Sequence, residues 1–203
     1  MKITALKQQI KNPERVSIFV DEQYVFSLSL DELVKHKLKN GDELSETDVK
    51  KYKKLSADGK LRARSLEWLM NRPHSIRELR DYLYRKKAEP EFIDRLAEEF
   101  LAKKYLNDEV YARWLVDLKS RAGKSNRAIK AELFKKGIDR ETVDLVMEAE
   151  AESEQDRLRE VINKKKSLSR YKNDKLKFIK YLTSQGFSYQ DVKQALKLEN
   201  PED

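Results

Sequence analysis

The sequence predicts a mainly α-helical protein, built from tandem three-helix repeats that form an elongated array, with a small β-containing domain at its N-terminus. Two features of the 203-residue chain predict this fold class. From about Lys60 onward, apolar residues recur only with the period of an α-helix, and the pattern repeats along the chain. The first 58 residues instead contain short runs of β-branched and aromatic residues.

The N-terminal segment has the pattern of a small antiparallel sheet. Residues 16–20 (VSIFV) and 24–28 (YVFSL) are strand-like runs separated by a polar triplet, which predicts a hairpin although no glycine is present. Residues 3–10 predict a third strand, because an Asn-Pro turn follows them. Ser29 and Glu32 have the spacing of a capping box, which predicts a short helix that ends near Asn40-Gly41.

Three later segments can be aligned as copies of one unit of three helices. The shared apolar positions of the first helices are Trp68-Leu69, Trp114-Leu115 and Val161-Ile162, spaced 46 and 47 residues apart. Those of the second helices are Leu83, Leu133 and Leu182, and those of the third are Ile93, Val143 and Val192. The chain is therefore predicted to divide into an N-terminal domain at 1–58 and repeats at 59–104, 105–151 and 152–203, with length differences confined to the loop between helices one and two.

Local chemistry predicts where these helices begin and end. The predicted N-terminal signals are a Ser75–Glu78 capping box, caps at Ser125 and Ser188, and Pro90 in a first turn. Gly137 and Gly186 are predicted to end second helices in the left-handed conformation, and Lys87 stands at the equivalent place in the first repeat. The helical spacing of the aromatic residues predicts core positions for Trp68, Trp114, Tyr82, Tyr111 and Phe134.

The positive charge of the chain is regional. The net charge is +8, but residues 119–140 carry eight Lys or Arg against two acids, and residues 159–180 carry nine against two. Residues 141–156, between them, carry seven acids and no cation. One such run alone is typical of a solvated helix face, whereas two separate excesses favour a surface that faces a polyanion.

No catalytic or metal site is predicted. The triplet Gly123-Lys124-Ser125 resembles the end of a P-loop, but a P-loop needs a glycine at position 118, which is Leu118, and a strand before it. The two histidines, His36 and His74, have no paired ligand nearby in the sequence, so solvated or loosely structural roles are expected. With no cysteine, disulfides and thiolate metal sites are excluded. No apolar run is long enough for a membrane span and no secretion signal is visible, so we expect a cytoplasmic protein without cofactors.

Residues 125–147 have the outline of a helix-turn-helix, with the turn at Gly137. A base-reading version would place Arg, Asn or Gln at the start of its second helix. Here that helix begins DRETVDLVMEAEAE, and its acids would repel DNA. The cations lie on the preceding loop and helix, which favours contact with the DNA backbone independent of sequence.

Two segments carry a resemblance to a known family. They are residues 70–83 (MNRPHSIRELRDYL) and residues 105–138 (YLNDEVYARWLVDLKSRAGKSNRAIKAELFKKGI). The second is similar to the Tyr-Leu-Asp-Asp, Phe-Ala, Gly-x-x-x-Ile and Glu-Leu-x-x-Lys-Gly-Ile pattern of the bacterial RecX regulators. The chain departs from that pattern at Lys104, where glycine commonly precedes the tyrosine, and at Asn107 and Tyr111, where the family has Asp and Phe.

The resemblance implies a non-catalytic protein that binds the RecA recombinase filament on DNA and modulates it. It is expected to impede filament growth or promote filament disassembly, and thereby to inhibit recombinase, ATPase and coprotease activity. The implied partners are RecA and single-stranded DNA, with double-stranded DNA as a further one; a monomer and no membrane are expected. The candidate residues facing RecA or DNA are Arg121, Lys124, Arg127, Lys130, Lys135, Lys136, Lys164, Lys165, Lys166, Arg170 and Lys172, with Arg72 and Arg77 as secondary candidates.

Two other hypotheses stay open at this point. The chain could be an autonomous architectural or regulatory protein that binds DNA without regard to sequence, in which case its affinity should fall steeply with salt. The third hypothesis is an enzyme that acts on nucleic acid, but no group of residues in the sequence supports it.

Overall fold

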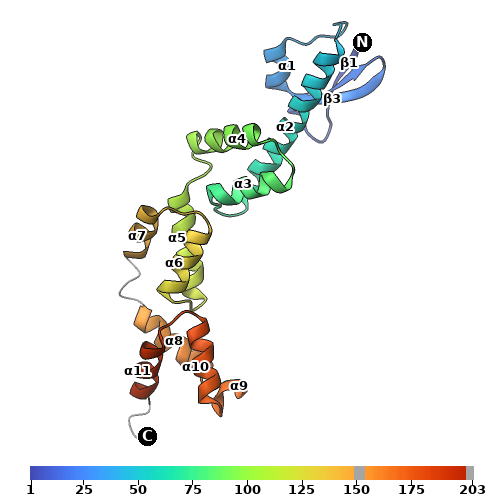
Figure 1. Cartoon of the computed structure of the whole chain (residues 1–203). Helices are drawn as coiled ribbons and strands as arrows, with labels where there is room; N and C mark the ends of the chain where they lie inside the picture. The colour runs from blue at the N-terminus through green and yellow to red at the C-terminus, as the bar shows by residue number, and fades with distance from the viewer. Residues whose placement is uncertain (149–153, 200–203) are drawn as a thin grey trace. The chain divides into compact units, whose positions relative to one another are not determined.

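The computed structural model of the chain describes residues 1–148 and 154–199 (Figure 1). The chain divides into two compact units, Met1–Asn71 and Arg72–Asp203. The first contains a small sheet and two helices, and the second contains helices alone within the described residues. This confirms the predicted fold class, mainly α with a small β-containing N-terminal part. The four-part division of the chain at residues 58, 104 and 151 stays a prediction.

The N-terminal sheet consists of β1 (Ile3–Gln8), β2 (Arg15–Val20) and β3 (Gln23–Ser29), paired antiparallel in that order. Both the hairpin and the third strand predicted from the sequence are therefore confirmed. The β2–β3 turn places Asp21 and Glu22 at φ values of 48° and 68°. Two residues with positive φ suit the right-handed twist of a hairpin, and Asp tolerates this region better than most non-glycine residues.

Two helices complete the first unit. In α1 (Leu30–His36), the predicted capping box of Ser29 and Glu32 is present, but the helix ends at Lys37, before the expected Asn40-Gly41. The 25-residue α2 (Glu46–Met70) continues without a break through residue 58. The inner face of α2 contributes Val49 and Tyr52 to the core of the sheet.

The second unit contains the helices of the repeats. They are α3 (Ile76–Arg85), α4 (Pro90–Ala102), α5 (Asp108–Arg121), α6 (Asn126–Lys135), α7 (Arg140–Glu148), α8 (Glu154–Lys165), α9 (Ser169–Lys172), α10 (Lys175–Ser184) and α11 (Tyr189–Glu199). The short α9 lies in the loop between the first and second helices of the third repeat, where the sequence alignment placed its length differences. The acidic run at residues 141–156 falls partly outside the described residues.

The aligned apolar positions form the cores of the repeats. Leu115, Leu133 and Val143 belong to the core of the middle repeat, and the equivalent Ile162 and Leu182 belong to that of the third. Tyr111 is buried as predicted, and Trp114 packs half-buried against the same core.

The prediction for Phe134 was wrong, because its side chain is 47% exposed. Leu133 already occupies the core-facing position of α6. The next residue along a helix points about 100° away from its predecessor. Phe134 therefore lies beside the core stripe and not within it.

The turns after the second helices share one backbone conformation. Gly137 and Gly186 have φ values of 81° and 101°, which confirms the predicted left-handed helix ends. Lys87 takes the same conformation, with φ of 59°. Because a lysine can adopt it, the backbone angle alone does not explain the glycines of the later repeats.

Successive repeats are joined at the N-termini of α3 and α6, the second helices of the first two repeats. Ser75 Oγ donates to the carbonyl of Lys136 (3.0 Å), and Ser125 N donates to the carbonyl of Gln185 (3.1 Å). The first N–H group of each helix binds an acid on the next repeat: Ile76 N donates to Asp108 Oδ1 and Asn126 N to Glu154 Oε1, both at 2.8 Å. The two joints therefore share their acid contact and a serine bond to a turn carbonyl, although this bond comes from the side chain of Ser75 and from the backbone of Ser125.

Substitution of Gly186 by alanine tests this joint. An added Cβ would lie 2.7 Å from Ala128 Cβ and overlap Ser125 Oγ, at a φ that alanine rarely adopts. We expect Gly186→Ala to lower the free energy of unfolding by about 2 kcal/mol or more, measured by urea denaturation followed by circular dichroism. The matched control is Lys87→Gly, which keeps the left-handed turn and should change stability by less than about 1 kcal/mol. Equal stability of Gly186→Ala and the wild type would contradict the described joint.

Candidate nucleic-acid interface

The predicted cations of the middle repeat lie at the end of α5, in the following loop and along α6. Arg121 pairs with Asp117 one turn earlier on α5 (2.8 Å). Lys124 is half-buried in the loop, where its carbonyl accepts from Arg157 (3.0 Å). Arg127 and Lys135 are exposed on α6, and neither pairs with an acid of the described residues. These last two are therefore the cations most available to a partner.

Lys130 has an acidic neighbour that recurs in the first repeat. Its Nζ lies 3.4 Å from Asp144 Oδ1 on α7. Fifty residues earlier, Arg80 on α3 pairs with Asp94 on α4 at 2.5 Å. These exposed pairs contribute little stability, but they fix equivalent cations on the second helices of two repeats.

Two predicted cations, Lys136 and Arg72, meet at a carboxylate that the sequence analysis had not assigned to the site. Glu78 is only 12% exposed and accepts from Lys136 Nζ (2.7 Å) and Arg72 Nη1 (2.9 Å). His74 Nδ1 lies 3.0 Å from the same carboxylate. Ser75 Oγ caps the Glu78 N–H as predicted, but the Glu78 side chain makes these contacts and does not complete a capping box.

The charge of Glu78 is stabilised by its partners. Burial by itself raises the pKa of a carboxyl group, but hydrogen bonds from Arg72, Lys136 and His74 outweigh it and lower the pKa of Glu78 to about 2. Tyr111 lies beside the cluster, its hydroxyl 3.4 Å from Glu78 Oε1, and burial together with the Glu78 charge raises the pKa of its phenol. The cluster therefore has a structural role in linking the first two repeats, since Lys136 and Glu78 are 58 residues apart.

The remaining secondary candidate, Arg77, lies on the exposed side of α3. Its aliphatic carbons cover Gly137, where an added Cβ would lie 2.9 Å from Arg77 Cδ. Its guanidinium has no acidic partner among the described residues. Arg77 thus combines a packed stem with an available charge.

The cations of the third repeat differ in their surroundings. Lys164 pairs with Glu160 (2.9 Å), and Arg170 lies over the Tyr171 ring, 4.8 Å from its centroid. Lys165 is half-buried, while Lys166 and Lys172 are exposed. The structure therefore distributes the predicted residues over several helices and does not bring them into one pocket.

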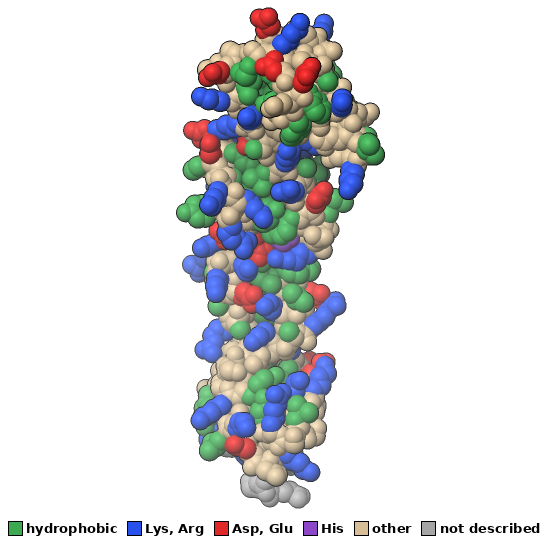
Figure 2. Space-filling view, turned by 90° about the vertical axis from the view of Figure 1, so that its right-hand side faces the viewer, with side chains coloured by type: hydrophobic (Ala, Val, Ile, Leu, Met, Phe, Trp, Pro, Cys, Tyr) green, Lys and Arg blue, Asp and Glu red, His purple; other side chains and the backbone are tan. Residues whose placement is uncertain are grey.

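Figure 2 shows one face of the molecule, on which Lys and Arg side chains are more numerous than Asp and Glu and alternate with apolar ones.

Exposed aromatic residues were missed by the sequence analysis. Tyr84 on α3 is 78% exposed and Phe134 on α6 is 47% exposed. Both directly follow the core leucine of their helix, Leu83 or Leu133, and this adjacency is the signal that could have revealed them.

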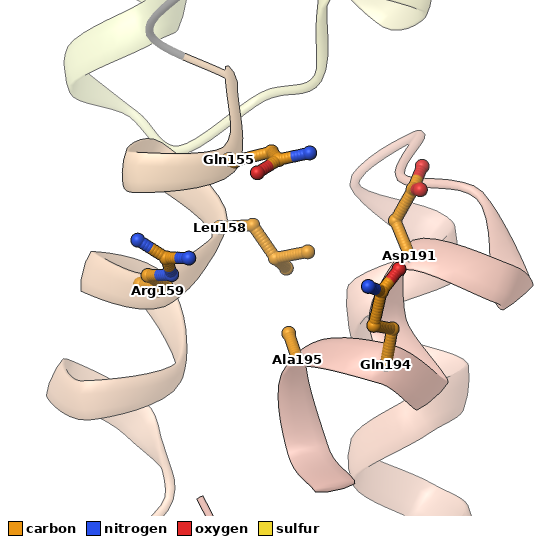
Figure 3. A pocket seen from close by; sticks show the side chains of 6 residues that line it. All are labelled: Gln155, Leu158, Arg159, Asp191, Gln194 and Ala195. Carbon is orange, nitrogen blue, oxygen red and sulfur yellow. The ribbon is translucent and has the colours of Figure 1, made fainter. Parts of the chain in front are cut away.

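The hollow between α8 and α11 does not have the features of an active site. Figure 3 shows the hollow between α8 and α11, where Leu158 and Ala195 face the gap and Gln155, Asp191 and Gln194 surround it. Its volume of 70 Å³ is enough for a few water molecules only. Within residues 1–148 and 154–199, no cluster of His, Asp or Glu could hold a metal ion, and no helix is long and apolar enough to cross a membrane.

Comparison with known proteins gives the family. Residues 1–45 match the family profile described as "Regulatory protein RecX N-terminal domain", and residues 107–147 match "RecX, second three-helix domain". Regulatory protein RecX of Bacillus subtilis is 33% identical over 210 residues, which cover 99% of this chain and 79% of that protein. The chain belongs to the RecX family of regulatory proteins.

Other RecX proteins extend the comparison. Regulatory protein RecX of Listeria innocua is 34% identical over 149 residues, which cover 73% of this chain but only 55% of the relative, a little over half its length. A crystal structure of regulatory protein RecX matches with a TM-score of 0.72 over 95% of this chain and 98% of that one, at 22% identity. RecX from Lactobacillus salivarius matches with a TM-score of 0.54 over 69% and 94%, at 21% identity. These two structures support the fold.

Replacement of Glu78 tests the charged cluster. Because the pKa of Glu78 is below the ordinary 4.5, its contribution to stability is complete above about pH 4.5 and is lost as the pH falls toward 2. We expect Glu78→Gln to lower the free energy of unfolding at pH 7 by about 2 kcal/mol, allowing for partial screening by solvent. The difference from the wild type should shrink between pH 4.5 and 2, as measured by denaturation at each pH.

The control for this substitution is Glu109→Gln. Glu109 forms an exposed pair with Arg113 on α5, so its loss should cost at most about 0.5 kcal/mol. A Glu78→Gln protein as stable as the Glu109→Gln protein would show that the cluster does not hold the repeats together.

Proposed function

We propose that the chain binds a RecA recombinase filament on DNA and inhibits filament growth, and with it recombinase, ATPase and coprotease activity. It does so without catalysis and as a monomer. The observation that carries the proposal is family membership combined with two exposed cations on α6, Arg127 and Lys135, that have no acidic partner in the part of the chain that the structure describes. A nucleoprotein filament offers both phosphates and repeated protein surfaces to such a face.

The repeat construction supports binding to a filament. Equivalent helices in successive repeats present equivalent side chains, such as Arg77 and Arg127, so one chain can contact neighbouring positions of a periodic partner. Each contact raises the effective concentration of the next, and weak contacts add to a strong overall association. The acidic start of α7, with Glu141 and Asp144, is unsuited to reading base edges in a groove.

The second candidate function is autonomous binding to DNA, independent of RecA. The observation in its favour is the same set of available cations, since they would contact phosphates on any DNA. The two functions differ in their dependence on RecA and salt. For autonomous binding, the logarithm of the affinity should fall with the logarithm of the salt concentration by about 0.9 for each duplex phosphate neutralised. Weak DNA binding together with strong inhibition of RecA favours the first function.

Charge reversal on the middle repeat tests the proposed function. We expect the combined substitutions Lys124→Glu, Arg127→Glu and Lys135→Glu to reduce inhibition of RecA ATPase activity on single-stranded DNA at least tenfold, because repulsion replaces attraction at three sites. Lys136 is left intact, since its contact with Glu78 would make loss of inhibition indistinguishable from loss of stability. Filament length by electron microscopy gives a second readout.

The control is a triple variant with the same change of charge in the N-terminal unit. Lys35 on α1 and Lys50 and Lys53 on α2 are exposed, and their replacement by Glu should leave most of the inhibition intact. Circular dichroism serves to test whether both triple variants are folded. Undiminished inhibition by the folded middle-repeat variant would refute the assigned surface.

A further inference from the structure

The first two repeats carry the same arrangement of cations and an exposed aromatic residue on their second helices. On α3, Arg77 and Arg80 precede Tyr84 by seven and four residues; on α6, Arg127 and Lys130 precede Phe134 by the same intervals. Residues four and seven apart lie on one face of a helix. Each helix therefore presents two cations and one aromatic ring on a single face.

Both rings are left uncovered by their surroundings. Tyr84 and Phe134 are the large apolar side chains exposed on α3 and α6, and neither has a ring or hydrogen-bonding partner for its side chain among the described residues. Beside Tyr84 lies a surface hollow of 280 Å³, which is also lined by Arg80, Asp81, Pro90, Ile93 and Asp94. An uncovered ring next to a hollow has space for a planar group.

The third repeat lacks this arrangement. The corresponding positions of α10 are Leu176, Ile179 and Thr183, which supply neither a cation nor a ring. The arrangement is therefore not a requirement of the repeat fold. It is a property of the first two repeats.

The surroundings of the rings indicate the class of ligand. A surface that docks another protein through apolar contact would be expected to be continuous, but each ring is a single exposed apolar side chain on its helix. Of the two cations on each face, Arg80 and Lys130 pair with Asp94 and Asp144, which leaves Arg77 and Arg127 without an acidic partner among the described residues. Single-stranded nucleic acid matches the pattern, because its unpaired bases can stack on aromatic side chains while its phosphates contact Lys and Arg. Duplex DNA matches it less well, since its bases are already stacked on one another.

We propose that Tyr84 and Phe134 are base-stacking residues for single-stranded nucleic acid, with Arg77 and Arg127 as the phosphate contacts beside them. The biological setting of this inference rests on the proposed function. The inference deepens that function by naming the part of the nucleic acid that these helices contact. Binding of a single strand by the chain itself can be measured without RecA, so the two proposals are tested separately.

The experiment compares two oligonucleotides that differ only in their bases. The full-length protein is titrated with fluorescent single-stranded oligo(dT) and with an abasic oligomer of equal length, which keeps the phosphates but offers nothing to stack. The wild type should bind oligo(dT) more tightly. Tyr84→Ala and Phe134→Ala should each weaken oligo(dT) binding roughly tenfold, leave abasic binding unchanged and preserve the salt dependence.

Further variants separate stacking from charge and from unfolding. Tyr84→Phe and Phe134→Tyr keep the rings and should bind as the wild type does. Arg77→Gln and Arg127→Gln should weaken both oligomers equally and reduce the salt dependence. The matched aromatic control is Tyr189→Ala on α11, where the ring is 61% exposed but lacks the pattern of cations, and it should change neither affinity.

Several results would overturn the inference. They are equal affinity of the wild type for the two oligomers, no measurable binding of oligo(dT), or unchanged oligo(dT) binding by the folded alanine variants. Loss of RecA inhibition with retained oligo(dT) binding would assign the rings to a protein partner and overturn it too. If instead the wild type fails to inhibit RecA but distinguishes oligo(dT) from the abasic oligomer through these rings, the stacking inference stands and the proposed function falls.

Discussion

The joint between repeats depends on the backbone groups at the N-termini of α3 and α6, the second helices of the first two repeats. The first N–H groups of a helix have no partner within it, so they must find acceptors elsewhere. Ser75 and Ser125 supply one acceptor as caps, and an acid from the following repeat supplies another, Asp108 or Glu154. The caps are fully buried because the next repeat packs over them. The same residues therefore cap the second helix and hold the next repeat in place, so a change that disrupts the cap also disrupts the packing of the repeats.

This constraint explains the glycines better than backbone conformation does. Gly137 and Gly186 lie in turns that pack against the preceding second helix, Gly137 against Arg77 and Gly186 against Ala128. Lys87 has the same left-handed conformation and is exposed, so its side chain has room. At the other end, the cap of α10 is Asp174, which is exposed, whereas the equivalent serines are buried. Small residues thus mark the positions where one repeat meets the next.

Much of the fold could be predicted because its signals are local. The spacing of Leu83, Leu133 and Leu182 reports a buried helix face, and the caps and turns lie within a few residues of their partners. The roles of Glu78 and Lys136 could not be predicted, because the two are brought together by packing across 58 residues. For the candidate site, the sequence indicated which helices carry the cations, but only the contacts show which of the cations have acidic partners.

The difference between paired and unpaired cations matters for function, since the net charge overstates the number of cations that a partner can contact. Lys136 and Arg72 neutralise a largely buried carboxylate at the first joint, and Arg157 bonds to Lys124 O and Asn126 Oδ1 at the second. Such cations stabilise the repeats and are not free to bind phosphate. Among the candidate residues of the first two repeats, Arg77, Arg127 and Lys135 are exposed and have no acidic partner within the described residues, and Arg77 and Arg127 occupy equivalent places. A few cations alone give weak binding that salt abolishes, so selective association with a single strand requires a further contribution that salt does not screen, and an exposed ring beside each arginine can provide it.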